Sequence, residues 1–101
     1  MQINISNHAY KRGKERLGFS KKTLNRMAAR VLDNGIQGTE LTGSALSWIE
    51  NKLDNYERTG TIYVYGDKAW VFIEKGNCIL LATILNLSNE ITRKIKIQIA
   101  Q

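Results

Sequence analysis

The hydrophobic pattern changes its period near residue 60, and this change constrains the fold more than any other feature of the chain. Before it, five apolar residues recur at the spacing of a stripe along one face of a helix: Leu24, Met27, Ala28, Val31 and Leu32. After it, residues 61–65 alternate with a period of two, which is typical of a half-buried strand. Helices followed by strands indicate the α+β class.

Capping residues mark the starts of the predicted helices. Three helices are predicted, over residues 7–17, 21–34 and 45–57. The residues that can cap them are Ser6 or Asn7, then Ser20, then Ser44. Gly18 and Gly35 end the first two helices. A short strand is predicted over residues 2–5, and a loop over residues 36–43.

Turn residues divide the second half of the chain into strands. Four are predicted, over residues 61–65, 68–74, 78–85 and 95–99. The third is apolar on both faces, which indicates an interior strand. In the last, Ile95, Ile97 and Ile99 alternate with Lys96 and Gln98, and its terminal position and lysine favour an edge.

The predicted fold is α+β, with two to three N-terminal helices followed by a four-stranded antiparallel sheet. The 101 residues suit a single domain, with a helical basic part over residues 6–57 and a β-meander over residues 61–100. Six side chains are predicted to be buried together: Leu24, Met27, Val31, Leu53, Phe72 and Leu81.

Composition favours a globular protein of the cytoplasm. The hydrophobic share is 43%, and no apolar run reaches the roughly 18 residues that a membrane span needs. The first residues lack the basic and then apolar segments of a secretory signal. Cys78 is the only cysteine, so it cannot form an internal disulfide, and its apolar neighbours predict a buried, inert thiol.

Positive charge is concentrated in the first third of the chain. Residues 1–30 hold eight Lys and Arg side chains against Glu15 alone, whereas residues 31–101 are nearly balanced. A polyanion such as nucleic acid is therefore the predicted partner, and a solvated basic face is the alternative. The predicted nucleic-acid-binding residues are Lys11, Arg12, Lys14, Arg16, Lys22, Arg26 and Arg30.

His8, Arg12 and Arg16 follow one another at four-residue steps, which places them along one face of the first helix. Two guanidinium groups can bind a phosphodiester, and an imidazole can exchange a proton near neutral pH. Together these groups suit metal-independent RNA cleavage. Two alternatives stay open: His8 as a capping or packing residue, and phosphate binding by the arginines without chemistry.

Aromatic residues offer a second possible contact with nucleic acid. Tyr63 and Tyr65 share one face of a predicted strand, and Trp70 and Phe72 share a face of the next. They can stack on bases or form the core beneath the helices, and so can Tyr10.

Several site types lack their sequence signals. One histidine and one cysteine far apart predict no metal site, and the scattered glycines form no phosphate-binding loop. No cofactor is predicted.

The opening residues resemble a known family. Ser6-Asn7-His8-Ala9, followed by Arg12, Glu15-Arg16 and Phe19-Ser20, is similar to the "HAxxRxxERxG(I/F)S" opening of small phage and mobile-element proteins of the RelE/barnase-like ribonuclease-toxin superfamily. Thr83 in Leu81–Leu85 resembles the threonine of their late "ITV"-type strand. The resemblance implies His8 as acid/base, Arg12 and Arg16 as phosphate binders, and Thr83 as a supporting hydrogen-bond donor.

The leading functional hypothesis is a small phage or mobile-element protein that binds RNA or a nucleoprotein, with RNase-like toxin activity as its enzymatic form. The first alternative is a non-enzymatic anti-defence inhibitor, of the anti-CRISPR kind, that binds a host nucleoprotein or occupies its nucleic-acid channel. The second is a plain interaction module with no nucleic-acid role. The corresponding protein partners are an antitoxin or a host defence protein.

Overall fold

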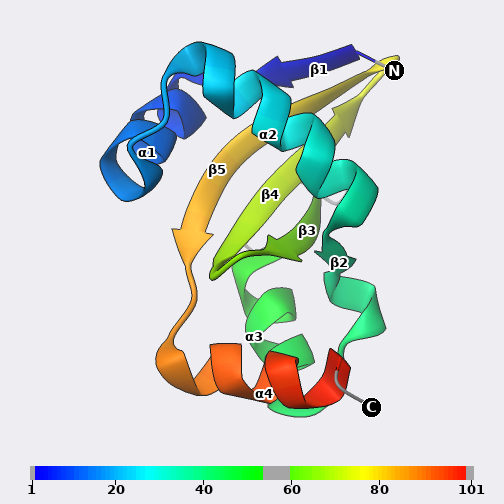
Figure 1. Cartoon of the computed structure of the whole chain (residues 1–101). Helices are drawn as coiled ribbons and strands as arrows, with labels where there is room; N and C mark the ends of the chain where they lie inside the picture. The colour runs from blue at the N-terminus through cyan, green and yellow to red at the C-terminus, as the bar shows by residue number, and fades with distance from the viewer. Residues whose placement is uncertain (1, 54–59, 100–101) are drawn as a thin grey trace.

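The computed structural model describes residues 2–53 and 60–99. Figure 1 shows an α+β fold, which confirms the predicted class. The helices are α1 (Asn7–Leu17), α2 (Lys21–Asn34), α3 (Gly43–Leu53) and α4 (Asn89–Ile99), with a short 3₁₀ turn at Gly38–Glu40. The strands are β1 (Gln2–Ile5), β2 (Ile36–Gln37), β3 (Gly60–Tyr65), β4 (Lys68–Lys75) and β5 (Cys78–Asn86).

The described strands form one five-stranded sheet in the order β1-β5-β4-β3-β2. β1 pairs with β5 in parallel, and every other pair is antiparallel. The predicted interior position of residues 78–85 is confirmed, because β5 lies between β1 and β4. The predicted loop over residues 36–43 is wrong at its start, where β2 adds two residues to the edge of β3.

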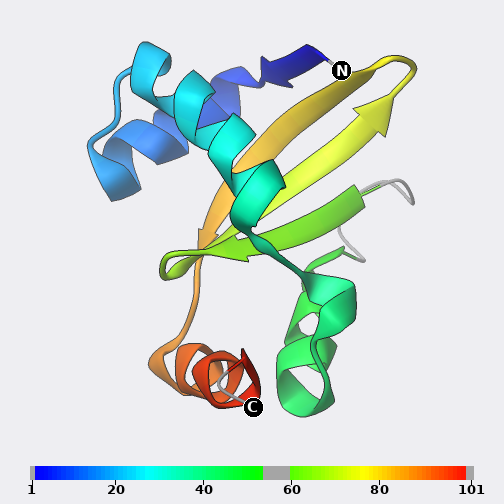
Figure 2. The same cartoon turned by 45° about the vertical axis from the view of Figure 1, so that its right-hand side comes forward.

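Two hydrophobic clusters form the core, one on each face of the sheet. The α1/α2 cluster contains Ala9, Leu24, Ala28, Val31, Trp70, Phe72, Leu81 and Ile84. The α3/α4 cluster contains Leu41, Ala45, Ile49, Ile62, Val64, Ala69, Val71, Ile91 and Ile95. Figures 1 and 2 show the same division, with α1 and α2 together in one part of the molecule and α3 and α4 side by side in another. In β4, Ala69 and Val71 serve one cluster and Trp70 and Phe72 the other, because side chains alternate between faces. In β5 a bulge opposite Val71 and Phe72 breaks the alternation, so Leu81 and Ile84 join the same cluster.

The predicted strand over residues 95–99 is wrong, because this segment belongs to α4. Ile91 and Ile95 are buried four residues apart, whereas Ile97 and Ile99 are exposed. The Ser88 hydroxyl accepts a hydrogen bond from the Ile91 amide at 3.2 Å and so caps the helix. The antiparallel meander therefore ends with β5. The two outer positions of the sheet are taken by β1 and β2 and not by a C-terminal strand.

The third predicted helix is confirmed as α3, although it begins two residues earlier than expected. Its predicted end, over residues 54–57, lies outside the described residues. The shared-core prediction is correct for Leu24, Val31, Phe72 and Leu81, and Met27 packs at the margin of their cluster. It is wrong for Leu53, which packs against the α3/α4 cluster on the other face of the sheet.

Leu81→Ala should lower the free energy of unfolding by about 2–5 kcal/mol, because it removes a fully buried side chain from the α1/α2 cluster. Ile97→Ala is the matched control, and with 56% of Ile97 exposed it should change stability by only about 0.5 kcal/mol. Urea unfolding of both variants measures the difference. Equal losses would contradict the assigned facing of β5.

Candidate nucleic-acid interface

α1 and α2 are joined by a tight three-residue turn. Gly18 ends α1 in the left-handed region at a φ of 68°, and its amide donates to the Lys14 carbonyl at 3.1 Å. The Phe19 amide donates to the Gly13 carbonyl at 3.3 Å. Ser20 then caps α2 by accepting a hydrogen bond from the Thr23 amide at 3.2 Å. These local bonds bring the last turn of α1 beside the first turn of α2.

The two helices carry eight cationic side chains, which we call the basic surface: Lys11, Arg12, Lys14, Arg16, Lys21, Lys22, Arg26 and Arg30. Their only carboxylates are Glu15 and Asp33. All the lysines, Arg26 and Arg30 are exposed, whereas Arg12 and Arg16 are half-buried. Lys22, Arg26 and Arg30 form a row on α2 at four-residue steps. The structure thus leaves most of the predicted charge open to a ligand.

A hollow of about 500 Å³ lies between α1 and α2, and we call it the α1–α2 hollow. It is lined by Tyr10, Lys11, Lys14, Gly18, Phe19, Ser20 and Lys21. The Lys21 ammonium lies 5.0 Å from the centre of the Tyr10 ring. Asn25 donates a hydrogen bond to the Tyr10 hydroxyl at 3.2 Å. The hollow therefore joins the cations of α1 to those of α2 around an aromatic side chain.

Lys21 is absent from the predicted binding residues because it lies off the four-residue row of Lys22, Arg26 and Arg30. A sequence signal for it did exist. Lys21 directly follows the capping Ser20 and comes three residues after the helix-ending Gly18, so it begins α2 next to the end of α1. Lys21 can therefore be recognised as a binding residue from its place after the turn between the helices, although not from helical periodicity.

The two half-buried arginines have intramolecular partners. Arg12 forms an ion pair of 2.8 Å with Glu15, one turn along α1. Arg16 donates a hydrogen bond to the carbonyl of Ile84 in β5. Arg16 thus holds α1 against the sheet, and a bound phosphate would compete with that contact.

His8 and Thr83, the other two residues that the family resemblance implies for catalysis, lie in contrasting surroundings. His8 is exposed in the first turn of α1, and no hydrogen bond or ion pair holds its imidazole among residues 2–53 and 60–99. Thr83 is only 2% exposed and pairs with Val71 of the α3/α4 cluster. Because paired residues project to the same face, the Thr83 side chain lies on the face away from α1 and α2.

The aromatic side chains of the sheet belong to the core. Trp70 and Phe72 are buried in the α1/α2 cluster, and Tyr63 packs edge-on against Phe72 with ring centres 5.6 Å apart. The rings of Trp70 and Phe72 are therefore covered, whereas Tyr63 and Tyr65 are half-buried at the margin of the same cluster. Tyr10 and Phe19 also pack against this cluster, but both line the α1–α2 hollow.

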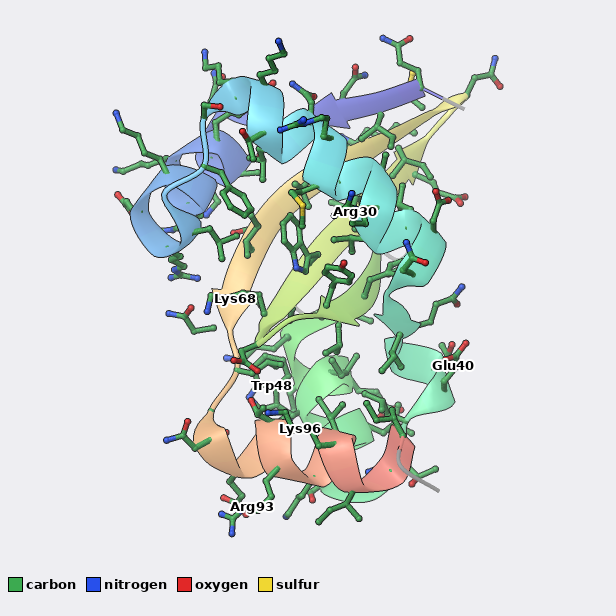
Figure 3. All side chains as sticks on the ribbon, viewed as in Figure 1. Arg30, Glu40, Trp48, Lys68, Arg93 and Lys96 are labelled. Atoms are coloured by element: carbon green, nitrogen blue, oxygen red, sulfur yellow. The ribbon has the colours of Figure 1, made fainter. Side chains whose placement is uncertain are left out.

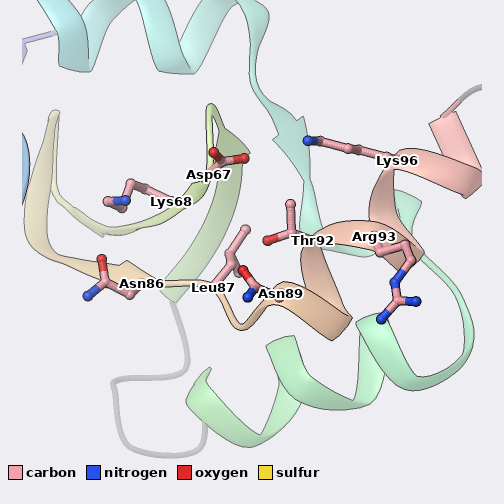
Figure 4. Close-up of a pocket in the computed structure, with 8 residues that line it drawn as sticks. All are labelled: Asp67, Lys68, Asn86, Leu87, Asn89, Thr92, Arg93 and Lys96. Atoms are coloured by element: carbon pink, nitrogen blue, oxygen red, sulfur yellow. The ribbon is translucent and has the colours of Figure 1, made fainter.

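A second depression, of about 540 Å³, lies where the β3–β4 turn meets α4 (Figure 4). Lys68, Arg93 and Lys96 line it together with Asp67. These three cations extend in different directions, and Arg93 turns away from the other two (Figure 4). They therefore offer no common point for one anion. Figure 3 also shows Arg93 on α4 far from Arg30 on α2, so the α4 side of this depression lies away from the row of cations on α2.

Two features are absent from residues 2–53 and 60–99, a metal-binding group and a membrane-spanning helix. In this part of the chain, no three His, Cys, Asp or Glu side chains lie close enough to share a metal ion. No helix in the same residues has the length and apolar character of a membrane span.

Comparison of the chain with protein-family models, with curated proteins and with solved structures gives no match. The likeness of its opening to the RelE/barnase-like superfamily, and its origin in a phage or mobile element, stay predictions.

The contacts of Arg16 and Arg12 lead to different expectations for stability. Arg16→Ala should lower the free energy of unfolding by about 1.5–3 kcal/mol, because the part-buried Ile84 carbonyl loses a charged donor. Arg12→Ala should lower it by only about 0.2–0.5 kcal/mol, since it breaks an ion pair within one helix whose side chains are 33% and 45% exposed and so reached by solvent. Urea unfolding tests both variants, and equal effects would show that the bond to β5 does not stabilise α1.

Proposed function

We propose that the protein binds RNA through the basic surface of α1 and α2. The observation that carries this proposal is the imbalance of eight cations against two carboxylates on these helices. Each cation that reaches a phosphate releases a condensed counterion, which favours binding at low salt. The row of Lys22, Arg26 and Arg30 offers phosphate contacts along α2, and the α1–α2 hollow extends the positive surface to α1.

Binding is favoured over cleavage by the surroundings of the four proposed catalytic residues. Arg12 is paired with Glu15, and Arg16 is bonded to the Ile84 carbonyl. Thr83 is buried on the opposite face of the sheet. RNA cleavage needs both a base for the 2′-hydroxyl and an acid for the leaving oxygen, and His8 is a single group of this kind. A toxin of this type would need a partner, such as a ribosome, to complete the site.

A second candidate function is inhibition of a host nucleoprotein, as in anti-defence proteins of the anti-CRISPR kind. It is favoured by Ile97 and Ile99, the exposed large hydrophobic residues of the described chain. They lie two residues apart on α4, so they point to different sides of this helix and form two separate apolar points that a protein partner could cover. Both belong to α4 rather than to the helices of the basic surface, so one molecule could contact RNA and protein through different elements.

RNA affinity should fall steeply with salt. If the protein makes about six phosphate contacts with a single strand, a plot of the logarithm of the association constant against the logarithm of the salt concentration should have a slope of about −4. This corresponds to a loss on the order of 10²–10³-fold between 50 and 200 mM salt. Fluorescence anisotropy with a labelled RNA measures the slope, and affinity that is indifferent to salt would contradict the proposal.

The location of the charge is tested by two matched double variants. Arg26→Ala with Arg30→Ala should reduce the slope by about 1.4, because two phosphate contacts are lost. Arg93→Ala with Lys96→Ala removes the same charge from α4 and should leave the slope nearly unchanged. Equal effects of the two pairs would show that net charge, rather than the basic surface, determines binding.

Free RNA should not be cleaved by the purified protein, and His8→Ala should keep the wild-type affinity. A single-turnover assay on mixed RNA in the presence of EDTA tests this, with Asn7→Ala as the neighbouring exposed control. Cleavage by the wild type that falls 10²–10⁴-fold in His8→Ala, at unchanged affinity, would instead establish His8 as a general acid or base.

A further inference from the structure

We propose that the α1–α2 hollow receives an unstacked nucleobase, so that the preferred ligand is single-stranded RNA. This inference rests on the proposed RNA binding and specifies its ligand. The volume of about 500 Å³ falls within the roughly 300–1,000 Å³ of small-ligand sites. The lining combines aromatic rings with lysines, and these are the two groups that recognise a base and its flanking phosphates.

Both aromatic side chains are held in place from behind. The Tyr10 ring packs against the α1/α2 cluster, and its hydroxyl accepts the hydrogen bond from Asn25 at 3.2 Å. Phe19 packs against the same cluster, and its amide is bonded to the Gly13 carbonyl at 3.3 Å. A ring that is already ordered loses little conformational freedom when a base stacks on it. The hollow is therefore preorganised for an aromatic ligand.

Lys21 covers the Tyr10 ring on which a base would stack. Its ammonium lies 5.0 Å from the centre of the Tyr10 ring, where it makes a cation–π contact. An exposed contact of this kind contributes roughly 2- to 5-fold to an equilibrium, whereas stacking of a base contributes roughly 5- to 150-fold. A base should therefore displace Lys21. The released ammonium would join Lys11 and Lys14 at the rim of the hollow and neutralise the adjoining phosphates.

A duplex cannot use this hollow, because its base faces are covered by the neighbouring base pairs. A purely electrostatic surface would show the opposite preference, since the phosphates of a duplex are more densely spaced than those of a single strand. The ratio of the two affinities therefore separates the hollow from the rest of the basic surface.

The test compares a single-stranded RNA of about 12 nucleotides, a length that one single-strand site can span, with a duplex of equal length. The strand carries one 2-aminopurine, whose fluorescence is quenched when it stacks. We expect the single strand to bind about tenfold more tightly than the duplex, with quenching on binding. Binding without quenching, at equal or better affinity for the duplex, would overturn this inference and leave the proposed RNA binding intact. Absence of binding to either RNA at low salt would overturn both.

Variants of Tyr10 assign the effect to the ring. Tyr10→Leu keeps an apolar side chain without a π face, and it should lower single-strand affinity roughly 5- to 100-fold while leaving duplex affinity unchanged. Tyr10→Phe keeps the ring and should stay within about twofold of the wild type. Lys22 lies outside the hollow, so Lys22→Ala should lower the affinity for the single strand and for the duplex by the same factor. Thermal unfolding confirms that each variant is folded, and single-strand affinity that is equal in Tyr10→Leu and Tyr10→Phe would contradict the proposal.

Discussion

Ser6 connects the sheet to the helices, and the position of the basic surface depends on it. Its amide donates to the Leu81 carbonyl at 3.0 Å and so extends the pairing of β1 with β5. Its hydroxyl donates to the Ala82 carbonyl at 2.8 Å and accepts from the Ala9 amide at 3.0 Å, which caps α1. One residue thus ends the strand, starts the helix and satisfies polar groups of β5. Buried or half-buried polar groups of a strand edge are costly without such partners.

Beyond Ser6, α1 protects the edge of β5 that β1 leaves open. β1 pairs with residues 78–81, and Arg16 reaches the Ile84 carbonyl further along the strand. Figure 1 shows α1 lying beside this part of β5. An uncovered strand edge would invite pairing with another chain, and the helix prevents this. The cations of α1 therefore divide by role: Arg16 stabilises the fold, whereas Lys11 and Lys14 point to solvent-accessible space around the hollow.

Local patterns predicted most elements correctly, and the errors arose where distant contacts decide the structure. The stripe of α2, its Ser20 cap and the strands β3 to β5 follow from short-range periodicity. Residues 95–99 alternate like a strand, but the cap at Ser88 and the burial of Ile91 and Ile95 favour a helix. In the candidate site, the positive charge of α1 and α2 was predictable from composition. The bond from Arg16 to Ile84 spans 68 residues, so no local pattern could show it.

The sheet divides the interior into two clusters that share no buried side chain. Substitutions at distant, independent sites have additive effects on stability, because they have no common neighbours. Changes among the core residues of α3 and α4 should therefore leave the geometry of α1 and α2 largely intact, and the reverse should also hold. The two sides of the molecule can consequently diversify independently during evolution. A protein that must keep one ligand while its other surface changes would benefit from this separation.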